Sequence, residues 1–456
     1  MDDAPEQGTD EPRPRTFLRN ATLTYSTNLA VAVLALVNIL IISRALGPAG
    51  RGDVAFLSAI VYLTANLAAL GINEANANYG AAEPEARAAL ATNSVVLAVV
   101  FSALANAVVL ILIALFPAVG GDVSRTLLLI SLATVPVLII GFYLQYLIQA
   151  DYRFVVTNIA WLLSPVTNVV VNGAFAVTGA LTVQSAVITN LVGQGLTSVM
   201  LFWYAATRFS GFGRPSMPIA VRSLRFGVRS HAGRIMLLGN YRLDQWLLGA
   251  ISGSRQLGLY SVAVSWAEVL FYLPTAIAAS QRPDLVRASR EEAAEHAAFI
   301  FRAATIVTVF LAGGLIAAAP ILCVTIFGED FRGSIVDLRI LALGAFGIVA
   351  LKQLGNALTA QSRPTLASAA ISVGFVSTLV LDILFIPPWG GVGAALASTI
   401  SYTVAGVAVI VIFARALGVP STALLPRWSD VASIARLARR LIRRLLPARI
   451  RWGVSR

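Results

Sequence analysis

The chain has 456 residues, of which 57% are hydrophobic and 12% charged, and its mean hydropathy is +0.79. Soluble globular chains average about 25% charged residues, so this composition excludes a large soluble enzyme and indicates a protein embedded in lipid. The net charge is +12, but the Arg residues stand between apolar runs or near the C-terminus. A nucleic-acid binder displays its basic residues on a solvated surface, so we expect no nucleic-acid partner.

Residues 1–19 are rich in acidic residues and Pro, and we expect them to form a disordered cytoplasmic tail. A secretory signal peptide would have a basic start and a short apolar core instead. The single Cys, Cys323, stands in an apolar run. It therefore allows no disulfide within the chain, and we expect neither a metal nor a cofactor.

Long apolar runs follow along the whole chain, and a transmembrane helix needs about 20 mostly apolar residues. By that rule the sequence predicts an all-α polytopic membrane protein with about twelve transmembrane helices. The first six are expected at 21–43, 54–78, 89–116, 126–149, 155–178 and 183–206. The second six are expected at 223–250, 256–281, 298–326, 334–360, 365–386 and 392–414.

The basic connection 207–222 lies near the midpoint and separates a predicted N-terminal lobe, 20–206, from a C-terminal lobe, 223–414. An internal repeat agrees with this division, because Gly52 and Gly258 open equivalent helices 206 residues apart. Two six-helix lobes around a central cleft are a common transporter plan. With a cytoplasmic N-terminus, most Arg residues fall in inside connections, so the positive-inside rule predicts that both termini are cytoplasmic in a bacterial inner membrane.

The C-terminal segment, 415–456, is predicted to be a basic amphipathic cytoplasmic tail. Between 431 and 446, apolar and Arg side chains occupy opposite sides of a helix with 3.6 residues per turn. Such a helix is expected to lie on anionic membrane lipids. The alternative is a solvated or disordered basic tail.

Predicted helix 223–250 has a polar stripe, and polar residues at membrane depth usually face a cavity or a partner helix. We expect Arg234 and Arg242 to face an aqueous cavity and to receive an anionic headgroup, because Arg offers a forked donor to phosphate. The alternative is that acids such as Glu74 or Glu268 neutralise them. The stripe consists of His231, Arg234, Tyr241, Arg242 and Gln245.

Predicted helix 54–78 has a second stripe, which combines Asn with an aromatic ring. These side chains suit sugar recognition, by hydrogen bonds to hydroxyls and stacking on C–H faces. The alternative is hydrogen bonding between helices, which Asn commonly provides in membranes. The stripe consists of Tyr62, Asn66, Asn73 and Asn76.

Four carboxylates are predicted to lie inside spans and are candidates for coupling transport to protons or cations. Lys352 is a possible mate for one of them. Asp244 is two residues from Arg242 and cannot face it on the same helix, so it should pair with another helix. The four are Glu74, Asp244, Glu268 and Asp382.

Sequence motifs of enzymes and nucleotide-binding proteins are absent. We find no Walker A lysine motif, no His-Glu-x-x-His and no Gly-x-Ser-x-Gly. Gly391-Val392-Gly393 follows no βαβ strand and is expected to be a turn before a membrane helix. The sequence therefore predicts a protein that is not an enzyme and binds no nucleotide.

Two segments resemble the polysaccharide-transport flippases of the multidrug/oligosaccharidyl-lipid/polysaccharide exporter superfamily. The first is Leu46-Gly47-Pro48 in the first outer loop, within 43–52. The second is Arg242-x-Asp244-x-x-Leu247-Leu248-Gly249, followed by Gly258-Leu259-Tyr260. Length, helix count and the two-lobed plan are similar over the whole chain.

This resemblance implies a flippase for a lipid-linked oligosaccharide on undecaprenyl pyrophosphate, working by alternating access of the two lobes. If the anionic headgroup expected at the stripe of 223–250 is this pyrophosphate, Arg234 and Arg242 would hold it. Other polysaccharide-assembly proteins are further expected partners. A drug or small-molecule cation antiporter of the same superfamily is an alternative, although its usual acid is missing from 21–43. A membrane polysaccharide polymerase is a further alternative, and it would need a long polar outer loop that this sequence lacks.

Overall fold

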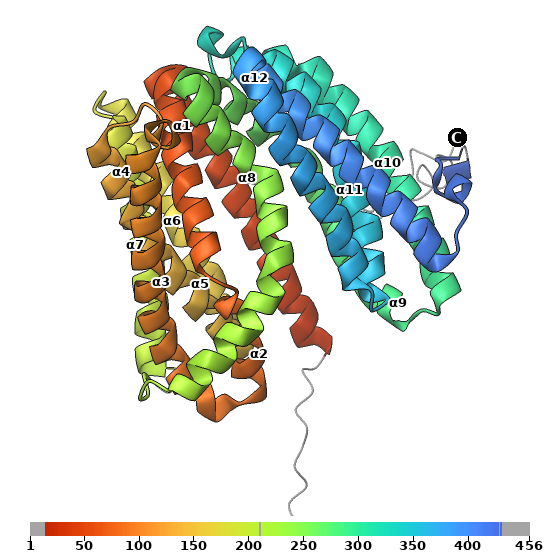
Figure 1. Cartoon of the computed structure of the whole chain (residues 1–456), viewed down its shortest axis with the longest axis horizontal. Helices are drawn as coiled ribbons and strands as arrows, with labels where there is room; N and C mark the ends of the chain where they lie inside the picture. The colour runs from red at the N-terminus through yellow and green to blue at the C-terminus, as the bar shows by residue number, and fades with distance from the viewer. Residues whose placement is uncertain (1–13, 209–210, 428, 431–456) are drawn as a thin grey trace, which may run out of the picture. The chain divides into compact units, whose positions relative to one another are not determined.

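The computed structural model describes residues 14–208, 211–427 and 429–430, and these are helical throughout except for short connections (Figure 1). The first helices are α1 (Pro14–Ala68), α2 (Ile72–Ala82), α3 (Arg87–Leu115), α4 (Arg125–Leu132), α5 (Thr134–Ala150), α6 (Phe154–Val177) and α7 (Val183–Arg208). Then come α8 (Met217–Ala267), α9 (Val269–Arg287), α10 (Arg290–Pro320), α11 (Ser334–Ala360) and α12 (Pro364–Leu417). Short helical turns are η1 (Pro84–Ala86), η2 (Pro117–Gly120), η3 (Ile321–Thr325), η4 (Glu329–Phe331) and η5 (Ser421–Leu424).

Nine helical stretches of the described chain are long and apolar enough to cross a membrane. Three of them have 47, 46 and 54 residues, about twice what one crossing needs. Each of these three is broken by one glycine with a positive φ, at Gly47, Gly253 or Gly390. Dividing them there gives twelve crossings, which confirms the predicted all-α polytopic fold and its helix count.

The chain divides into two compact units, Met1–Ile235 and Met236–Arg456. This boundary lies within α8, later in the chain than the predicted linker 207–222. The linker is not a free connection, because Gly213 N–H donates to the Ala88 carbonyl at 3.0 Å and Thr92 Oγ1 donates to the Gly213 carbonyl at 2.7 Å. Contacts with α3 thus hold the start of α8 in the first unit.

The predicted tails lie mostly outside the described residues. Residues 1–13 of the expected N-terminal tail are outside them, and the chain is already helical from Pro14. The predicted amphipathic helix 431–446 is also outside them.

In the first unit, α5 packs at the centre of the apolar core. Tyr143, Leu144, Leu147 and Ile148 are fully buried. The Tyr143 hydroxyl donates to the backbone carbonyl of Ala69 at 2.9 Å, so its one polar atom is satisfied within the apolar surroundings.

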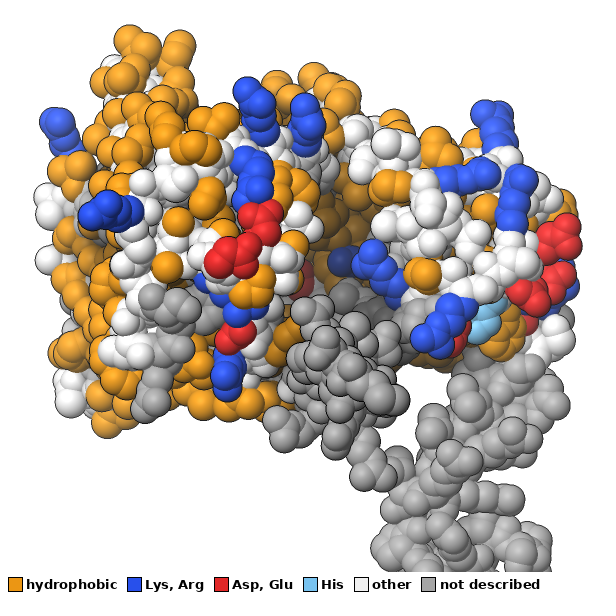
Figure 2. Space-filling model, turned by 90° about the horizontal axis from the view of Figure 1, so that it is seen from below, with side chains coloured by type: hydrophobic (Ala, Val, Ile, Leu, Met, Phe, Trp, Pro, Cys, Tyr) orange, Lys and Arg blue, Asp and Glu red, His pale blue; other side chains and the backbone are white. Residues whose placement is uncertain are grey.

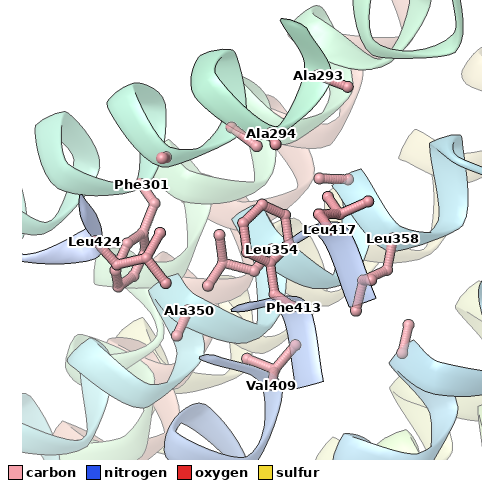
Figure 3. Packing of buried hydrophobic residues seen from close by; sticks show 14 of the residues in the cluster. Ala293, Ala294, Phe301, Ala350, Leu354, Leu358, Val409, Phe413, Leu417 and Leu424 are labelled. Atoms are coloured by element: carbon pink, nitrogen blue, oxygen red, sulfur yellow. The ribbon is translucent and has the colours of Figure 1, made fainter. Parts of the chain in front are cut away.

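In the second unit, α10, α11 and α12 share an apolar core in which Leu354 and Phe413 are fully buried (Figure 3). The crossing of α11 and α12 is close, because a Cβ at Gly347 would overlap the Tyr402 backbone carbonyl. Small residues allow helices to approach this closely in membrane proteins. Any larger side chain at Gly347 would force the two helices apart.

Candidate substrate and coupling sites

The first candidate site lies in the first unit, where α1 ends and α2 begins. Leu70 and Gly71 both have positive φ, at 45° and 68°, and they turn the chain so that Glu74 stands in the first turn of α2. Gly71 and Gly227 touch through their backbones, and a Cβ on either would overlap the other segment. This contact places α8 beside the start of α2.

Arg234 of α8 and Glu74 of α2 form an ion pair at this place. Arg234 Nη1 lies 2.9 Å from Glu74 Oε1 and 3.4 Å from the Tyr146 hydroxyl. The two charged side chains are 40% and 39% exposed. The pair is therefore accessible from outside the protein core, and an incoming anion could reach the guanidinium.

Two further residues of the predicted stripes lie near this pair. Tyr62 is 40% exposed and interacts electrostatically with Arg234. His231 is buried beside the backbone of Asn66 and Leu67. An aromatic ring and an imidazole therefore accompany the guanidinium.

The three Asn residues of the 54–78 stripe make hydrogen bonds within the protein. Asn76 Nδ2 donates to Ser94 Oγ at 2.7 Å and to the Tyr143 carbonyl at 3.1 Å, which joins three helices. Asn66 Nδ2 donates to the carbonyl of its own helix at Tyr62, and Asn73 Nδ2 donates to Glu74 Oε1 at 3.4 Å. For Asn76 this is the hydrogen bonding between helices that the sequence left open as the alternative to sugar recognition.

The second candidate site lies in the second unit, between α8 and its continuation at α9. Arg242 Nη1 lies 2.7 Å from Glu268 Oε1, and Nη2 lies 3.4 Å from Oε2. These side chains are 30% and 29% exposed. Tyr241 packs against Phe271, with ring centroids 6.1 Å apart. This pair is also partly accessible.

Two other residues that the sequence analysis named, Lys352 and Gln245, lie outside these two ion pairs. Lys352 Nζ lies 5.9 Å from the centroid of the Tyr241 ring, so this aromatic face is a neighbour of the ammonium. Gln245 is buried, and its backbone N–H donates to Asp244 Oδ1 at 2.7 Å.

Asp244 is buried on the other side of α8 and bonds to two other helical segments. Tyr260 donates its hydroxyl hydrogen to Oδ2, and the Ser398 hydroxyl donates to the same oxygen at 3.1 Å. Asp244 therefore pairs away from Arg242, as its position on the helix predicted.

Asp382 of α12 is fully buried, and neither of its carboxylate oxygens has a hydrogen-bond partner in the described part of the chain. It also interacts electrostatically with Asp244. A buried unpaired carboxylate is costly, and it becomes tolerable when it takes up a proton or a cation. The described residues contain no group of three or more His, Cys, Asp or Glu that could hold a metal, so a cation here would also need hydroxyl or carbonyl oxygens.

The equivalent positions of the first unit hold amides. Asn38 precedes Asp244 by 206 residues and Asn172 precedes Asp382 by 210. In the first unit Asn172 Nδ2 donates to Asn38 Oδ1 at 2.8 Å. The sequence analysis identified neither this correspondence nor the hydrogen bond from Ser398 to Asp244. Extending the internal repeat to the polar residues would have revealed the correspondence.

These features, twelve crossings with paired and unpaired charges inside them, define a multi-pass membrane protein. Residues 17–280 match the model of the polysaccharide biosynthesis protein family. The chain belongs to this family. No curated protein matches it.

Solved structures of two kinds of transporter have the same fold. The lipid II flippase MurJ in an inward closed conformation is 13% identical, with a TM-score of 0.70, over 86% of this chain and 87% of that one. An inward-facing multidrug resistance MATE transporter is 16% identical, with a TM-score of 0.70, over 86% and 98%. An outward-facing one is 15% identical, with a TM-score of 0.59, over 89% and 96%. At these identities the likeness concerns the fold alone.

Proposed function

We propose that the protein is a flippase that moves a lipid-linked oligosaccharide across a bacterial cytoplasmic membrane for cell-surface polysaccharide biosynthesis. The carrier would be undecaprenyl pyrophosphate. The observation that carries the proposal is the pair of accessible arginines inside the spans, Arg234 and Arg242, in a chain of the polysaccharide biosynthesis family.

Each arginine would hold pyrophosphate by exchanging its carboxylate partner for the incoming anion. A bare charge in hydrocarbon is very costly, so the pyrophosphate is the part of the substrate that most resists crossing. Glu74 and Glu268 keep the guanidinium groups neutralised while no substrate is bound. Phosphate accepts forked, charge-assisted hydrogen bonds from Arg as a carboxylate does, so the exchange replaces one set of strong bonds with another.

We infer alternating access from the fold, since inward-facing and outward-facing conformations both occur among the transporters that share it.

The orientation in the membrane follows from the distribution of Arg in the first unit. Its end at the start of α8 has Arg87, Arg222 and Arg225, and the positive-inside rule makes this the cytoplasmic end. Both termini would then be cytoplasmic.

Asp244 and Asp382 are the candidates for coupling. Two buried carboxylates close enough to interact electrostatically cannot both be ionised cheaply without a counter-ion. A proton or a monovalent cation bound there would change the charge of the second unit during each cycle. The hydroxyls of Tyr260 and Ser398 supply additional oxygens.

Export of a small cationic compound is the second candidate function, because a multidrug transporter matches the fold with the same TM-score as the lipid II flippase. The accessible arginines favour the flippase, since they would repel a cation. The described chain also has no acid between Thr22 and Leu46 of α1.

A gene deletion in the source organism distinguishes the two functions. Under the proposal, lipid-linked oligosaccharide accumulates on the cytoplasmic leaflet and surface glycan falls, and the wild-type gene restores both. The double variant R234A/R242A should not restore them, although it reaches the membrane. Unchanged glycan together with increased sensitivity to cationic drugs would show that the protein is an antiporter instead.

A further inference from the structure

A groove at the start of α8 lies outside both candidate sites. It has a volume of about 710 Å³ and lies within the first unit, between the end of α2 and the first turns of α8. Figure 2 shows Lys and Arg side chains on the face where these ends lie, and largely apolar side chains beyond it. The groove is lined by Tyr79, Pro218, Val221, Arg222, Arg225, Phe226 and Arg229.

Arg222, one of the three arginines that line the groove, is paired with a carboxylate. Arg222 makes two hydrogen bonds to the Glu83 carboxylate, at 2.9 and 2.6 Å, and the bond raises the pKa of Arg222 above its ordinary value. Its guanidinium also lies 4.3 Å from the centroid of the Tyr79 ring. Glu83 therefore neutralises this side chain and holds it in place.

The other two arginines are exposed and have no acidic partner in the described part of the chain. Arg225 and Arg229 stand three and seven residues after Arg222, so all three lie on one face of α8. The groove thus offers two uncompensated guanidinium groups together with the rings of Tyr79 and Phe226, whose centroids lie 5.6 Å apart. Their forked donors suit phosphate oxygens.

The apolar residues beside the groove favour a lipid over a soluble anion. Met217, Val221 and Val228 are 75%, 40% and 50% exposed, and Val221 also lines the groove. On α8 these apolar side chains form a strip about 90° around the helix from the strip of arginines. A helix that exposes an apolar strip beside a basic one lies at the depth of lipid headgroups. An acyl or isoprenyl chain could then contact the apolar side while the arginines hold the phosphate.

We propose that this groove binds the phosphate headgroup of a lipid at the membrane surface. This site is separate from Arg234 and Arg242 and does not depend on the proposed transport function. The lipid is either an anionic phospholipid or a polyprenyl phosphate, since both present phosphate next to an apolar chain.

Native mass spectrometry of the purified full-length protein in an uncharged detergent tests the proposal. The probes are phosphatidylglycerol, undecaprenyl phosphate, zwitterionic phosphatidylcholine and inorganic pyrophosphate. The test variant is R225Q/R229Q, which removes the two uncompensated charges. The matched control is R125Q/R255Q, because Arg125 and Arg255 are also exposed and the same charge is removed far from the groove in the sequence.

The wild type should bind phosphatidylglycerol or undecaprenyl phosphate more tightly than phosphatidylcholine. R225Q/R229Q should weaken that binding about tenfold or more, and R125Q/R255Q should leave it unchanged. The tighter of the two phosphorylated lipids identifies the ligand. Equal binding by wild type and R225Q/R229Q, equal loss in the control, or inorganic pyrophosphate binding as tightly as the lipids would each overturn the proposal. Transport by R234A is a separate measurement, so the two proposals can fail independently.

Discussion

Gly47 and Gly253 stand 206 residues apart and break their helices with the same backbone conformation. Their φ and ψ angles are 65° and −175° in Gly47, and 79° and 172° in Gly253. Four more pairs of residues with positive φ follow at separations of 207 to 211 residues. They are Gly121 and Gly328, Tyr152 and Ser362, Gly179 and Gly390, and Gly211 and Gly418. The connections therefore repeat in order, as expected if the halves are copies of one six-helix plan.

The remaining positive-φ residues of the described chain, Leu70 and Gly71, have no such counterpart. They break α1 from α2 immediately before Glu74. The first unit thus departs from the repeat next to the ion pair of Glu74 with Arg234.

Gly47→Ala and Gly253→Ala should each destabilise the protein by about 1–3 kcal/mol, because this conformation is essentially restricted to glycine. Space is not the reason, since no atom lies within 4 Å of a Cβ at Gly47. Gly195→Ala is the matched control: its Cβ also meets nothing within 4 Å and it lies inside α7 with ordinary helical geometry. Thermal unfolding in detergent measures the effect. Equal melting of Gly47→Ala and Gly195→Ala would contradict the explanation.

Arg234→Lys should impair glycan export partly and Arg234→Ala severely. Lysine keeps the charge but loses the forked geometry, and charge-assisted hydrogen bonds are worth about 1.5–3 kcal/mol each. Alanine should therefore weaken headgroup binding roughly ten- to a hundredfold. Complementation of a deletion strain, with membrane levels quantified, measures both.

The variant Glu74→Gln distinguishes substrate binding by Arg234 from a purely structural ion pair between Glu74 and Arg234. A structural pair would make Glu74→Gln and Arg234→Ala equally harmful, because each removes one partner. If Arg234 holds pyrophosphate, Glu74→Gln leaves the arginine free and export continues. Normal export by Arg234→Ala and Arg242→Ala at wild-type levels would show that neither arginine receives the substrate.

Asp244→Asn with Asp382→Asn should uncouple transport without unfolding the second unit. The equivalent positions in the first unit are the amides of Asn38 and Asn172, which bond to each other at 2.8 Å. An amide pair is therefore compatible with this packing, while it binds neither proton nor cation. Uptake of a fluorescent lipid-linked substrate into proteoliposomes should then no longer respond to an imposed proton or Na⁺ gradient. A full response in the double variant would exclude these acids as the coupling site.

Asp430 should fasten the segment after α12 to α10 only when it is ionised. Arg302 Nε lies 2.7 Å from Asp430 Oδ2, and Arg302 Nη1 donates to the Ala423 carbonyl at 2.6 Å. Burial acts to raise the pKa of Asp430, but hydrogen bonds from Arg302 and from the Arg427 N–H outweigh it and hold the pKa below its ordinary value.

The lowered pKa sets the sign of the pH dependence. The stabilisation is fully present above the unfolded pKa of about 4 and is lost as the pH falls through the folded value. Hydrogen exchange in 421–430, corrected for its intrinsic pH dependence, should therefore rise in Asp430→Asn at neutral pH and in the wild type only below about pH 4. Glu329→Gln is the control, because the pair of Glu329 with Arg332 is exposed. Equal hydrogen exchange in Asp430→Asn and in the wild type at pH 7 would show that Asp430 does not fasten this segment to α10.

The sequence by itself determined the class of protein and the number of its crossings. Each crossing needs about 20 apolar residues in a row, and that property is local. The breaks of the three longest helices were also predictable, because Gly47, Gly253 and Gly390 each fall between two of the predicted spans. The distribution of Arg predicted an orientation for the same reason, because the positive-inside rule counts the basic residues next to each span, and that count is also local.

Only the tertiary structure decided which polar residues meet. Glu74 and Arg234 are 160 residues apart, and Asp244 and Ser398 are 154 apart, so their contacts depend on how helices pack. Periodicity placed Asn76 on a polar face, yet a face toward a cavity and a face toward another helix have the same period. Its hydrogen bonds to Ser94 and Tyr143 are contacts that the period alone could not predict. The position of the boundary within α8 was likewise set by contacts, because Gly227 fits against Gly71 only where neither has a side chain.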